Sequence, residues 1–548
     1  MKHAKKQPAA HKPPKWLETA TFYQIYPQSF CDTNGDGIGD IQGIISKLDY
    51  IQSLGVNALW LNPVFESPFR DAGYDISNFY KVAPRYGTNR DLKRLFQEAH
   101  RRGIRVCLDL VAGHTSSQHP WFKASSRARR NQYTDWYIWT DSAWDDREPN
   151  AIRGFSEREG GYLPNFFYFQ PALNYGYAKP DPSKKWQLSV SDPSVQAVRR
   201  EMRKIMKFWL DAGADGFRVD MAASLVRGDA DGQGLRDLWK EFRQWLDRDY
   251  PEAVLISEWC HPHNSNAAGF DIDFMIHFGE PAYNALLGTW NRCVGGLNAG
   301  GAPVFFEREG GGDIRLFLDN YLHHYHGTAG RSYISLPTGN HDFPRHRRGR
   351  DERDMRVIYA MLFTMPGVPF IYYGDEIGMR YRENLTAKEG SYKNRTGTRT
   401  PMQWRRRRNA GFSTAPASKL YLPIDPAPDA PTVEEQESNP KSLLNLSRRL
   451  LALRKKYLAL GNTGGFRPVY AEKKKYPFVY ERSLGNERFW IAINPTGRPL
   501  KLSLPGLESA GAVEVLDTEM VAGPEKTALS MGPVSFGVFR IKDKSRDS

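Results

Sequence analysis

The sequence predicts an α/β protein whose main domain is a (β/α)8 TIM barrel. Between residues 40 and 373, helical stretches that end at glycine alternate with short apolar strands, which indicates a parallel sheet. The strands are almost continuously apolar, so both faces of the sheet should be covered. Polar residues follow several of these strands directly. A barrel gathers such positions at one mouth, whereas an open sheet spreads them along an edge.

The helix–glycine–strand unit is clearest in three places. Apolar residues recur at helical spacing in residues 40–54, in residues 89–102, and from the candidate N-cap Asp192 onward. Glycine ends each of these helices, at Gly55, Gly103 and Gly213. Strands are predicted at 56–61, 104–111, 216–220, 254–258 and 368–373.

Two stretches break this pattern and define the predicted domains. Residues 115–191 are rich in aromatic residues, proline and glycine without a helical period, which indicates an inserted domain. From residue 463, short strands separated by turns predict a C-terminal antiparallel β-sandwich, with strands at 469–471, 478–482, 489–494, 513–516 and 536–541. The predicted organisation is a disordered basic tail (1–18), the barrel (19–114 and 192–462), the insertion (115–191) and the β domain (463–548).

Composition limits the classes of function. The chain has 548 residues, and 40% are hydrophobic, which is enough for sizeable cores. No apolar run is long enough for a membrane span, and the basic N-terminus lacks the apolar core of a signal peptide. Four dispersed cysteines fit reduced thiols, so we expect a cytoplasmic protein without a membrane partner. The net charge of +14 comes without a nucleic-acid motif, so we expect no nucleic-acid partner.

Four segments end predicted strands with polar groups. They are Asp109 to His114, Gly216 to Asp220, Ile256 to Glu258 and Gly339 to Asp342. An aspartate after one strand is most often a helix cap, but four such segments in this order strongly indicate functional residues. With them the sequence resembles glycoside hydrolase family 13, the alpha-amylase family, over residues 19 to 545. The resemblance includes the segments 55–63, 73–75, 374–378 and 399–404.

The resemblance implies a barrel (domain A), an inserted domain B and a C-terminal β domain C. It implies that Asp220 is the nucleophile, Glu258 the general acid/base, and Asp342 a third carboxylate that holds sugar hydroxyls. Two such carboxyls cleave an alpha-glucosidic bond with retention when one attacks the anomeric carbon and the other protonates the leaving oxygen. Arg218, two residues before the nucleophile, should keep it ionised, and a pocket that raises the pKa of Glu258 should keep the acid protonated.

The substrate-binding residues also follow from the resemblance. His114 and His341 would donate hydrogen bonds to the sugar, and Tyr74 would stack beneath it. Asp71 and Arg399 match the pair that closes the pocket in exo-acting members of the family. The resemblance therefore implies that one terminal glucose unit is removed at a time.

A glycine-containing acidic loop near the N-terminus is a candidate metal site. Side-chain oxygens recur at alternate positions, as at the start of a calcium loop, but residue 43 is glycine, so the closing glutamate of an EF-hand is missing. The expected ligands of one structural Ca²⁺ are Asp32, Asn34, Asp36, the Ile38 carbonyl and Asp40. A metal-free turn is the alternative.

Three positions depart from the family pattern. Gly113 and Ala172 replace the usual Asn and Asp, which removes two oxygen ligands of a second calcium site. Met221 stands directly after the nucleophile, where the family's glucosidases carry residues that separate alpha-1,4 from alpha-1,6 substrates, and methionine matches neither group.

Three functions compete for this sequence. The first is a retaining exo-acting alpha-glucosidase that hydrolyses, and in part transglycosylates, short alpha-glucosides. The second is a maltose isomerase of the trehalose synthase type or another alpha-glucosyltransferase. The third, a non-catalytic sugar-binding relative, is disfavoured because all three carboxylates are present.

Overall fold

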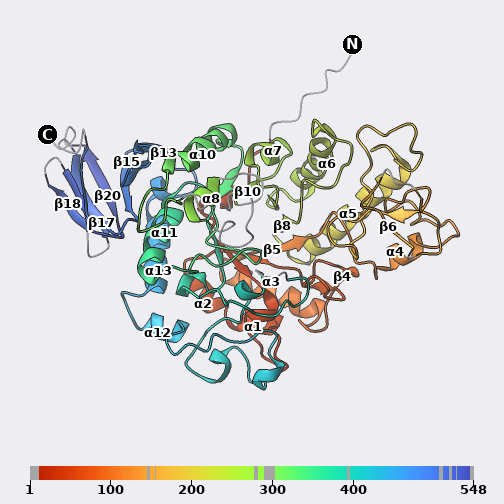
Figure 1. Cartoon of the computed structure of the whole chain (residues 1–548), viewed down its shortest axis with the longest axis horizontal. Coiled ribbons are helices and arrows are strands. Elements are labelled where there is room, and N and C mark those ends of the chain that lie inside the picture. The colour runs from red at the N-terminus through yellow and green to blue at the C-terminus, as the bar shows by residue number, and fades with distance from the viewer. Residues whose placement is uncertain are drawn as a thin grey trace, which may run out of the picture.

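The computed structural model describes residues 11–144, 148–154, 156–276, 282–288, 303–391, 395–504, 510–517, 521–525 and 528–543. For 510–517, 521–525 and 542–543 it describes the backbone. The barrel lies in the middle of the molecule, with the β domain at one end and the insertion that carries α4 and β6 at the other (Figure 1). In the described part of the chain, no helix is long and apolar enough to cross a membrane.

Eight parallel strands form the barrel, in the order β11-β10-β9-β8-β5-β2-β1-β12. Val368 N donates to Ile334 O at 3.2 Å and Thr338 N to Phe370 O at 2.9 Å, which joins the first and last strands of this order. The strands are β1 Phe22–Ile25, β2 Ala58–Leu61, β5 Arg105–Leu110, β8 Gly216–Val219, β9 Val254–Ser257, β10 Ile272–Phe274, β11 Tyr333–Ser335 and β12 Phe370–Tyr372.

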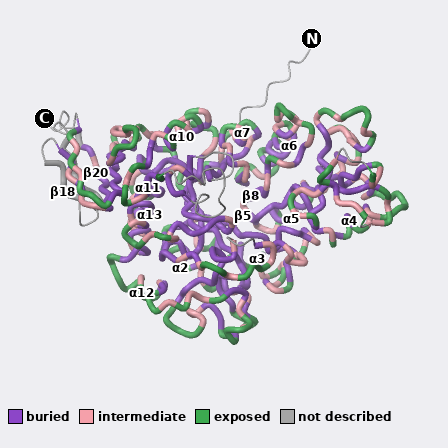
Figure 2. Tube along the Cα trace, in the orientation of Figure 1, coloured by how far each residue is buried: buried purple, intermediate pink, exposed green. Residues whose placement is uncertain are grey.

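Helices surround the barrel, and the buried residues concentrate on its strands (Figure 2). Aromatic rings fill part of the interior: the Phe22 and Phe370 rings stack at 4.4 Å, and Trp60 lies 5.6 Å from Phe274. The helices outside the insertion are α1 Ile41–Ser46, α2 Leu48–Ser53, α3 Asn89–Arg101, α5 Pro193–Ala212, α6 Gln233–Asp249, α7 Pro262–Ala267, α8 Ala282–Leu287, α10 Ile314–Thr328, α11 Glu352–Thr364, α12 Val433–Glu437 and α13 Leu443–Lys456.

The sequence signals explain these elements locally. Asp192 caps α5 by accepting from Ser194 N, Pro193 occupies its first position, and Gly213 ends it with φ +116°. The predicted helix 40–54 is divided instead into α1 and α2, because Lys47 between them leaves the helical region at φ −110° and ψ 3°.

The inserted segment contains little regular structure. It carries the helix α4 Pro120–Ser125 and a two-stranded sheet of β6 Ile152–Arg153 and β7 Gly161–Tyr162. A second small sheet, β3 Phe65–Glu66 with β4 Asn78–Val82, lies in the loop after β2. Backbone hydrogen bonds join the insertion to the barrel, among them Leu173 N to Gly113 O at 3.0 Å.

The C-terminal domain has a five-stranded sheet, β13-β14-β15-β20-β17, and a three-stranded sheet, β16-β19-β18. All five predicted strands are present, whereas β16, β18 and β19 had not been predicted. One apolar cluster joins the two sheets, with Val479 and Trp490 from the first and Leu529 and Met531 from the second. The strands are β13 Gly465–Tyr470, β14 Phe478–Leu484, β15 Glu487–Asn494, β16 Leu500–Ser503, β17 Ala510–Asp517, β18 Val521–Glu525, β19 Ala528–Met531 and β20 Ser535–Asp543.

The N-terminal tail is partly ordered, which corrects the prediction of disorder for residues 1–18. Residues 1–10 lie outside the described part of the chain, but 15–19 form a short 3-10 helix with Leu17 fully buried. His11 contacts Asp247 at 3.0 Å and Asp271 at 2.7 Å. Hydrophobic burial and these polar contacts offset the entropy cost of ordering this segment.

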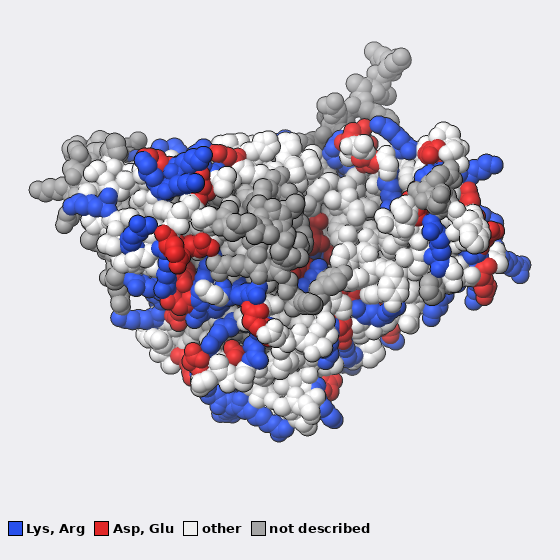
Figure 3. All heavy atoms as spheres, viewed as in Figure 1, with Lys and Arg blue, Asp and Glu red and all other residues white. Residues whose placement is uncertain are grey.

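Two other expectations concern cysteines and charge. Cys31, Cys107 and Cys260 are buried free thiols, and Cys293 lies outside the described residues. On the face shown in Figure 3, basic side chains are interspersed with acidic ones.

Candidate active site

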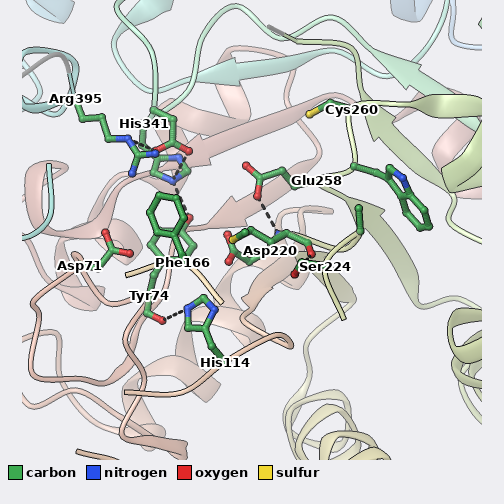
Figure 4. Close-up of a pocket in the computed structure, with 14 residues that line it drawn as sticks. Asp71, Tyr74, His114, Phe166, Asp220, Ser224, Glu258, Cys260, His341 and Arg395 are labelled. Atoms are coloured by element: carbon green, nitrogen blue, oxygen red, sulfur yellow. Dashed lines mark hydrogen bonds and ion pairs between the residues drawn. The ribbon is translucent and has the colours of Figure 1, made fainter. Parts of the chain in front are cut away.

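The polar strand ends meet at one pocket of about 380 Å³. It brings together seven residues expected from the sequence: Asp71, Tyr74, His114, Asp220, Glu258, His341 and Asp342 (Figure 4). Arg218 and Arg399 are buried behind its wall. Sequence reasoning missed the lining residues Phe166, Trp259, Cys260 and Arg395.

Arg218 joins the two carboxyls of the expected catalytic pair. Its Nη1 lies 3.0 Å from Asp220 Oδ1, and its Nη2 lies 2.7 Å from Glu258 Oε1. The first contact was expected from the spacing on β8, but the second was not. Nη1 also lies 2.9 Å from Asp109 Oδ1, a fully buried carboxyl on β5. One guanidinium therefore fixes three carboxyls from three neighbouring strands.

The pocket raises the pKa of both members of the pair. Burial raises the pKa of Glu258 to about 8 and that of Asp220 to about 7, against the opposing effect of Arg218. The raised pKa keeps Glu258 protonated, as a proton donor requires, whereas Arg218 does not hold the pKa of Asp220 low, contrary to what their spacing had suggested. Glu258 Oε2 also accepts a hydrogen bond from Met221 N at 3.0 Å.

Asp342 is the ionised carboxylate of the pocket. Burial alone would raise its pKa, but Arg395, His341 and Arg399 outweigh this effect and hold the pKa well below its usual range. Arg395 Nε lies 3.2 Å and Arg399 Nη2 lies 3.3 Å from its Oδ1. An anionic Asp342 can accept hydrogen bonds from sugar hydroxyls, which fits its expected role.

A chain of hydrogen bonds fixes the His341 ring. Gln24 Nε2 at 3.0 Å and Asn62 Nδ2 at 3.2 Å both donate to its Nδ1, so Nε2 carries the proton. This Nε2 lies 2.8 Å from the Tyr74 hydroxyl, which itself donates to Asp109 Oδ2 at 2.9 Å. The Tyr74 and His341 rings also stack at 5.4 Å. Tyr74 is thus held rigidly as one wall of the pocket.

His114 is fixed in the same way and, like His341, uses its N–H within the protein. Its Nε2 donates to the Tyr74 carbonyl at 3.1 Å, and its Nδ1 accepts from Asn165 Nδ2 at 3.2 Å. Burial lowers the pKa of His114 to about 4, so the ring is neutral. The hydrogen bond that His114 is expected to donate to a sugar stays a prediction. It requires the Nε2–H to be shared between the sugar and the Tyr74 carbonyl.

Asn165 from the insertion occupies the space beside Gly113. A Cβ at Gly113 would lie 2.6 Å from Asn165 Nδ2, so this position requires glycine unless Asn165 moves. Asn165 Nδ2 also lies 3.9 Å from Met221 Sδ, next to the expected nucleophile. No sequence pattern singled out Asn165, because the insertion lacks helical or strand periodicity.

Asp71 and Arg399 lie differently with respect to the pocket, and their expected role in holding a terminal sugar hydroxyl stays a prediction. Asp71 lines the pocket and accepts from Gln170 Nε2 at 2.7 Å, and burial raises its pKa to about 6. Arg399 is 1% exposed and donates from Nε to the His341 carbonyl at 2.8 Å. The arginine that lines the pocket is Arg395, four residues earlier.

The acidic loop of residues 32–40 is organised largely by its own hydrogen bonds. Asp32 accepts from Gly35 N and Gly37 N, both at 2.8 Å, and Asp36 accepts from Ile38 N at 2.8 Å. Asp40 caps α1 by accepting from Gly43 N at 2.6 Å. Among the described residues, no three His, Cys, Asp or Glu side chains converge as metal ligands. These hydrogen bonds close the loop as a turn, and calcium binding stays a proposal.

The barrel gathers four carboxyls in one pocket, an arrangement typical of enzymes that use carboxyl groups as acids, bases or nucleophiles. The family model described as "Alpha amylase, catalytic domain" matches residues 24–285 and 311–463. The chain therefore belongs to the alpha-amylase family, glycoside hydrolase family 13. It is an enzyme of the alpha-glucosidase or alpha-glucosyltransferase kind.

Three similar proteins illustrate the range of this family. The chain is 34% identical over 504 residues to the trehalose synthase/amylase TreS of Mycolicibacterium smegmatis, covering 83% of this chain and 78% of that protein. It is 31% identical over 539 residues to the oligo-1,6-glucosidase of Parageobacillus thermoglucosidasius, covering 89% and 92%. The trehalulose synthase MutB from Pseudomonas mesoacidophila MX-45 superposes with a TM-score of 0.77 at 27% identity, covering 96% and 99%.

Proposed function

We propose that this enzyme removes terminal glucose from short alpha-glucosides with retention of configuration. Asp220 attacks the anomeric carbon while Glu258 gives its proton to the leaving oxygen, which yields a glucosyl-Asp220 intermediate. Glu258 then takes a proton from water as the water oxygen attacks the same carbon and releases Asp220. The observation that carries this proposal is the placement of both carboxyls on one guanidinium inside one pocket.

Exo action is supported by the size and lining of the pocket. Its volume of about 380 Å³ suits a short ligand, and Asp71, Asp342 and Arg395 supply charged partners for hydroxyl groups. Phe166 lines the same pocket and is 43% exposed, so its ring can contact an apolar sugar face. In this proposal Arg395 takes the role that the sequence had suggested for Arg399.

An isomerase of the trehalose synthase type is the second candidate, favoured by the similarity to TreS. Hydrolysis and isomerisation would share the glucosyl-Asp220 intermediate. They differ in whether water or the retained sugar attacks it, which depends on how well the closed pocket excludes water. Met221 lines the pocket beside Asp220, where it can influence the preference between alpha-1,4 and alpha-1,6 linkages.

Proton NMR of the enzyme with maltose separates these candidates. The reducing unit of maltose releases both anomers, so the informative signal is an excess over the equilibrium mixture. An early excess of alpha-glucose supports retaining hydrolysis, and an early excess of beta-glucose would contradict it. Trehalose without free glucose would support the isomerase. If maltose is not converted, isomaltose and sucrose test other alpha-glucosides, and no reaction with any of the three would contradict the glucosidase proposal.

A further inference from the structure

Asp273, on β10, lies behind the loop that follows the candidate acid Glu258. Its carboxyl is 2% exposed and accepts three hydrogen bonds from this loop and one from Ser257 at the end of β9. The donors to Oδ1 are Ser257 Oγ at 2.7 Å, Trp259 N at 3.1 Å and Cys260 N at 3.3 Å, and the donor to Oδ2 is His261 N at 2.8 Å. Both flanks of Glu258 are therefore fixed to one buried side chain.

The loop needs such a partner because of its backbone conformation. Cys260 has φ +59°, a left-handed conformation that costs a non-glycine residue free energy. Three successive N–H groups, those of residues 259 to 261, point toward this one carboxyl, as in backbone anion-binding nests, while burial raises its pKa to about 7. Without the carboxylate these buried donors would lose their partner, and the loop would adopt another conformation.

The backbone contacts of Glu258 show why the conformation of this loop affects the direction of the Glu258 side chain. Its backbone N donates to Val219 O at 3.0 Å, and its carbonyl accepts from Ala222 N at 3.2 Å. These two bonds hold it to β8 and the turn after β8. At its carboxyl end the side chain is held by Arg218 Nη2 at 2.7 Å and Met221 N at 3.0 Å. At its backbone end its direction depends on residues 257 and 259 to 261, which Asp273 fixes.

We propose that Asp273 is a positioning residue that aims the Glu258 carboxyl at the leaving-group oxygen. This inference rests on the proposed function, in which Glu258 is the proton donor. Asp273 is not itself a lining residue of the pocket, but it holds the backbone of the lining residues Trp259 and Cys260 and so acts through the loop. General acid catalysis depends steeply on this geometry, because a group misplaced by about 1 Å can lose about 100-fold in rate.

Two substrates that differ in their leaving group test the inference. Maltose needs a proton on its leaving oxygen, whereas alpha-glucosyl fluoride releases fluoride without general acid catalysis. We expect Asp273→Ala to lower kcat/KM about 100-fold on maltose and less than about 5-fold on the fluoride. Asp273→Asn, which keeps one oxygen acceptor, should show the same selectivity with a smaller loss. The asparagine variant also tests the inference if Asp273→Ala does not fold.

Two further variants make the result specific. Glu258→Gln should show the same preference for the fluoride, because it lacks the acid itself. Asp271→Asn is the matched control, since Asp271 is also a buried carboxyl of this strand region and accepts from Leu255 N at 2.8 Å and Arg243 Nη1 at 3.1 Å. Asp271→Asn should lower the melting temperature and leave the ratio of kcat/KM on maltose to kcat/KM on the fluoride unchanged.

The outcomes separate this inference from the proposed function. Equal losses on both substrates in the folded Asp273 variants would overturn the positioning role, while selectivity in Glu258→Gln would leave the proposed function standing. If Glu258→Gln itself lost activity equally on both substrates, the assignment of the acid would fail and the inference with it. Losses that are selective for maltose in the Asp273 variants and in Glu258→Gln would support the positioning role and the proposed function.

Discussion

Arg218 Nη2 lies 2.7 Å from Glu258 Oε1, so the guanidinium that pairs with the nucleophile also holds the acid. The sequence predicted the contact with Asp220 from the spacing of two residues on one strand. It gave no sign of the contact with Glu258, which comes from the neighbouring strand β9. The two catalytic carboxyls are therefore coupled through a shared cation, and their protonation must be treated as that of a pair.

This coupling predicts a bell-shaped pH dependence of kcat/KM. Activity needs ionised Asp220 and protonated Glu258, whose pKa values burial raises to about 7 and about 8. We expect activity to fall below the lower value, where Asp220 is protonated, and above the higher one, where Glu258 is ionised. Initial rates with maltose from pH 5 to 10 provide the measurement. A rate that still rises above pH 9 would contradict the assignment of Glu258 as the acid.

The raised pKa of Glu258 also predicts how stability depends on pH. A carboxyl with a folded-state pKa of about 8 stabilises the protein fully below its unfolded pKa, and this contribution is lost as the pH rises toward 8. We expect the melting temperature of Glu258→Gln, relative to the unmodified enzyme, to increase between pH 5 and 8 and then level off. A constant difference across this range would contradict the raised pKa.

Removal of the nucleophile should abolish turnover without loss of the fold. Asp220→Asn keeps the shape of the side chain but cannot form the glucosyl-enzyme, so we expect kcat to fall by at least about 10⁴-fold. Circular dichroism and the melting temperature should show a folded protein. An Asp220→Asn enzyme with half of the normal activity would remove Asp220 from the nucleophile role.

The two arginines near Asp342 should behave differently when truncated. Arg395 lines the pocket, so Arg395→Ala should raise KM more than it lowers the melting temperature. Arg399 is fully buried against Asp342 and the His341 carbonyl, so Arg399→Ala should cost about 3–5 kcal/mol of unfolding free energy. Steady-state kinetics and denaturant unfolding of both variants test this. The reverse pattern would return the substrate-binding role to Arg399.

The crowding at Gly113 predicts a compensating pair of substitutions. Gly113→Asn places a side chain where Asn165 lies, so we expect a loss of about 1–3 kcal/mol in unfolding free energy. The double variant Gly113→Asn/Asn165→Gly should recover part of this loss, because the space is freed. A double-mutant cycle with additive free energies would show that the two positions are independent.

Calcium binding by the loop of residues 32–40 remains a proposal with a direct test. If the loop holds Ca²⁺, EDTA should lower the melting temperature, because a ligand at about 100 times its Kd stabilises the fold by about 2.7 kcal/mol. Activity at low temperature should change less, since the loop precedes α1 and supplies no residue to the pocket. An unchanged melting temperature and no metal by elemental analysis would leave the metal-free turn.

The sequence by itself determined the barrel, the β domain and the main catalytic candidates. Helical periodicity, glycine stops and apolar strands are local signals, so β2, β5, β8, β9 and β12 were predicted directly. The strands β10 and β11 were not predicted, because Asp273 interrupts the first and Ser335 ends the second, whereas the equally short β12 lies within the apolar run 368–373. Their place in the barrel follows from pairing with neighbours that are distant in sequence.

The tertiary structure decided how the catalytic residues act on one another. Local spacing placed Arg218 beside Asp220, but the contacts of Arg218 with Glu258, of Asn165 with His114, and of Asp273 with the loop after Glu258 join separate strands or the insertion. Such contacts depend on the closed barrel and on how the insertion packs against it. Burial in that closed barrel also raises the pKa values of Asp220 and Glu258, because it removes the water that would stabilise their charged forms.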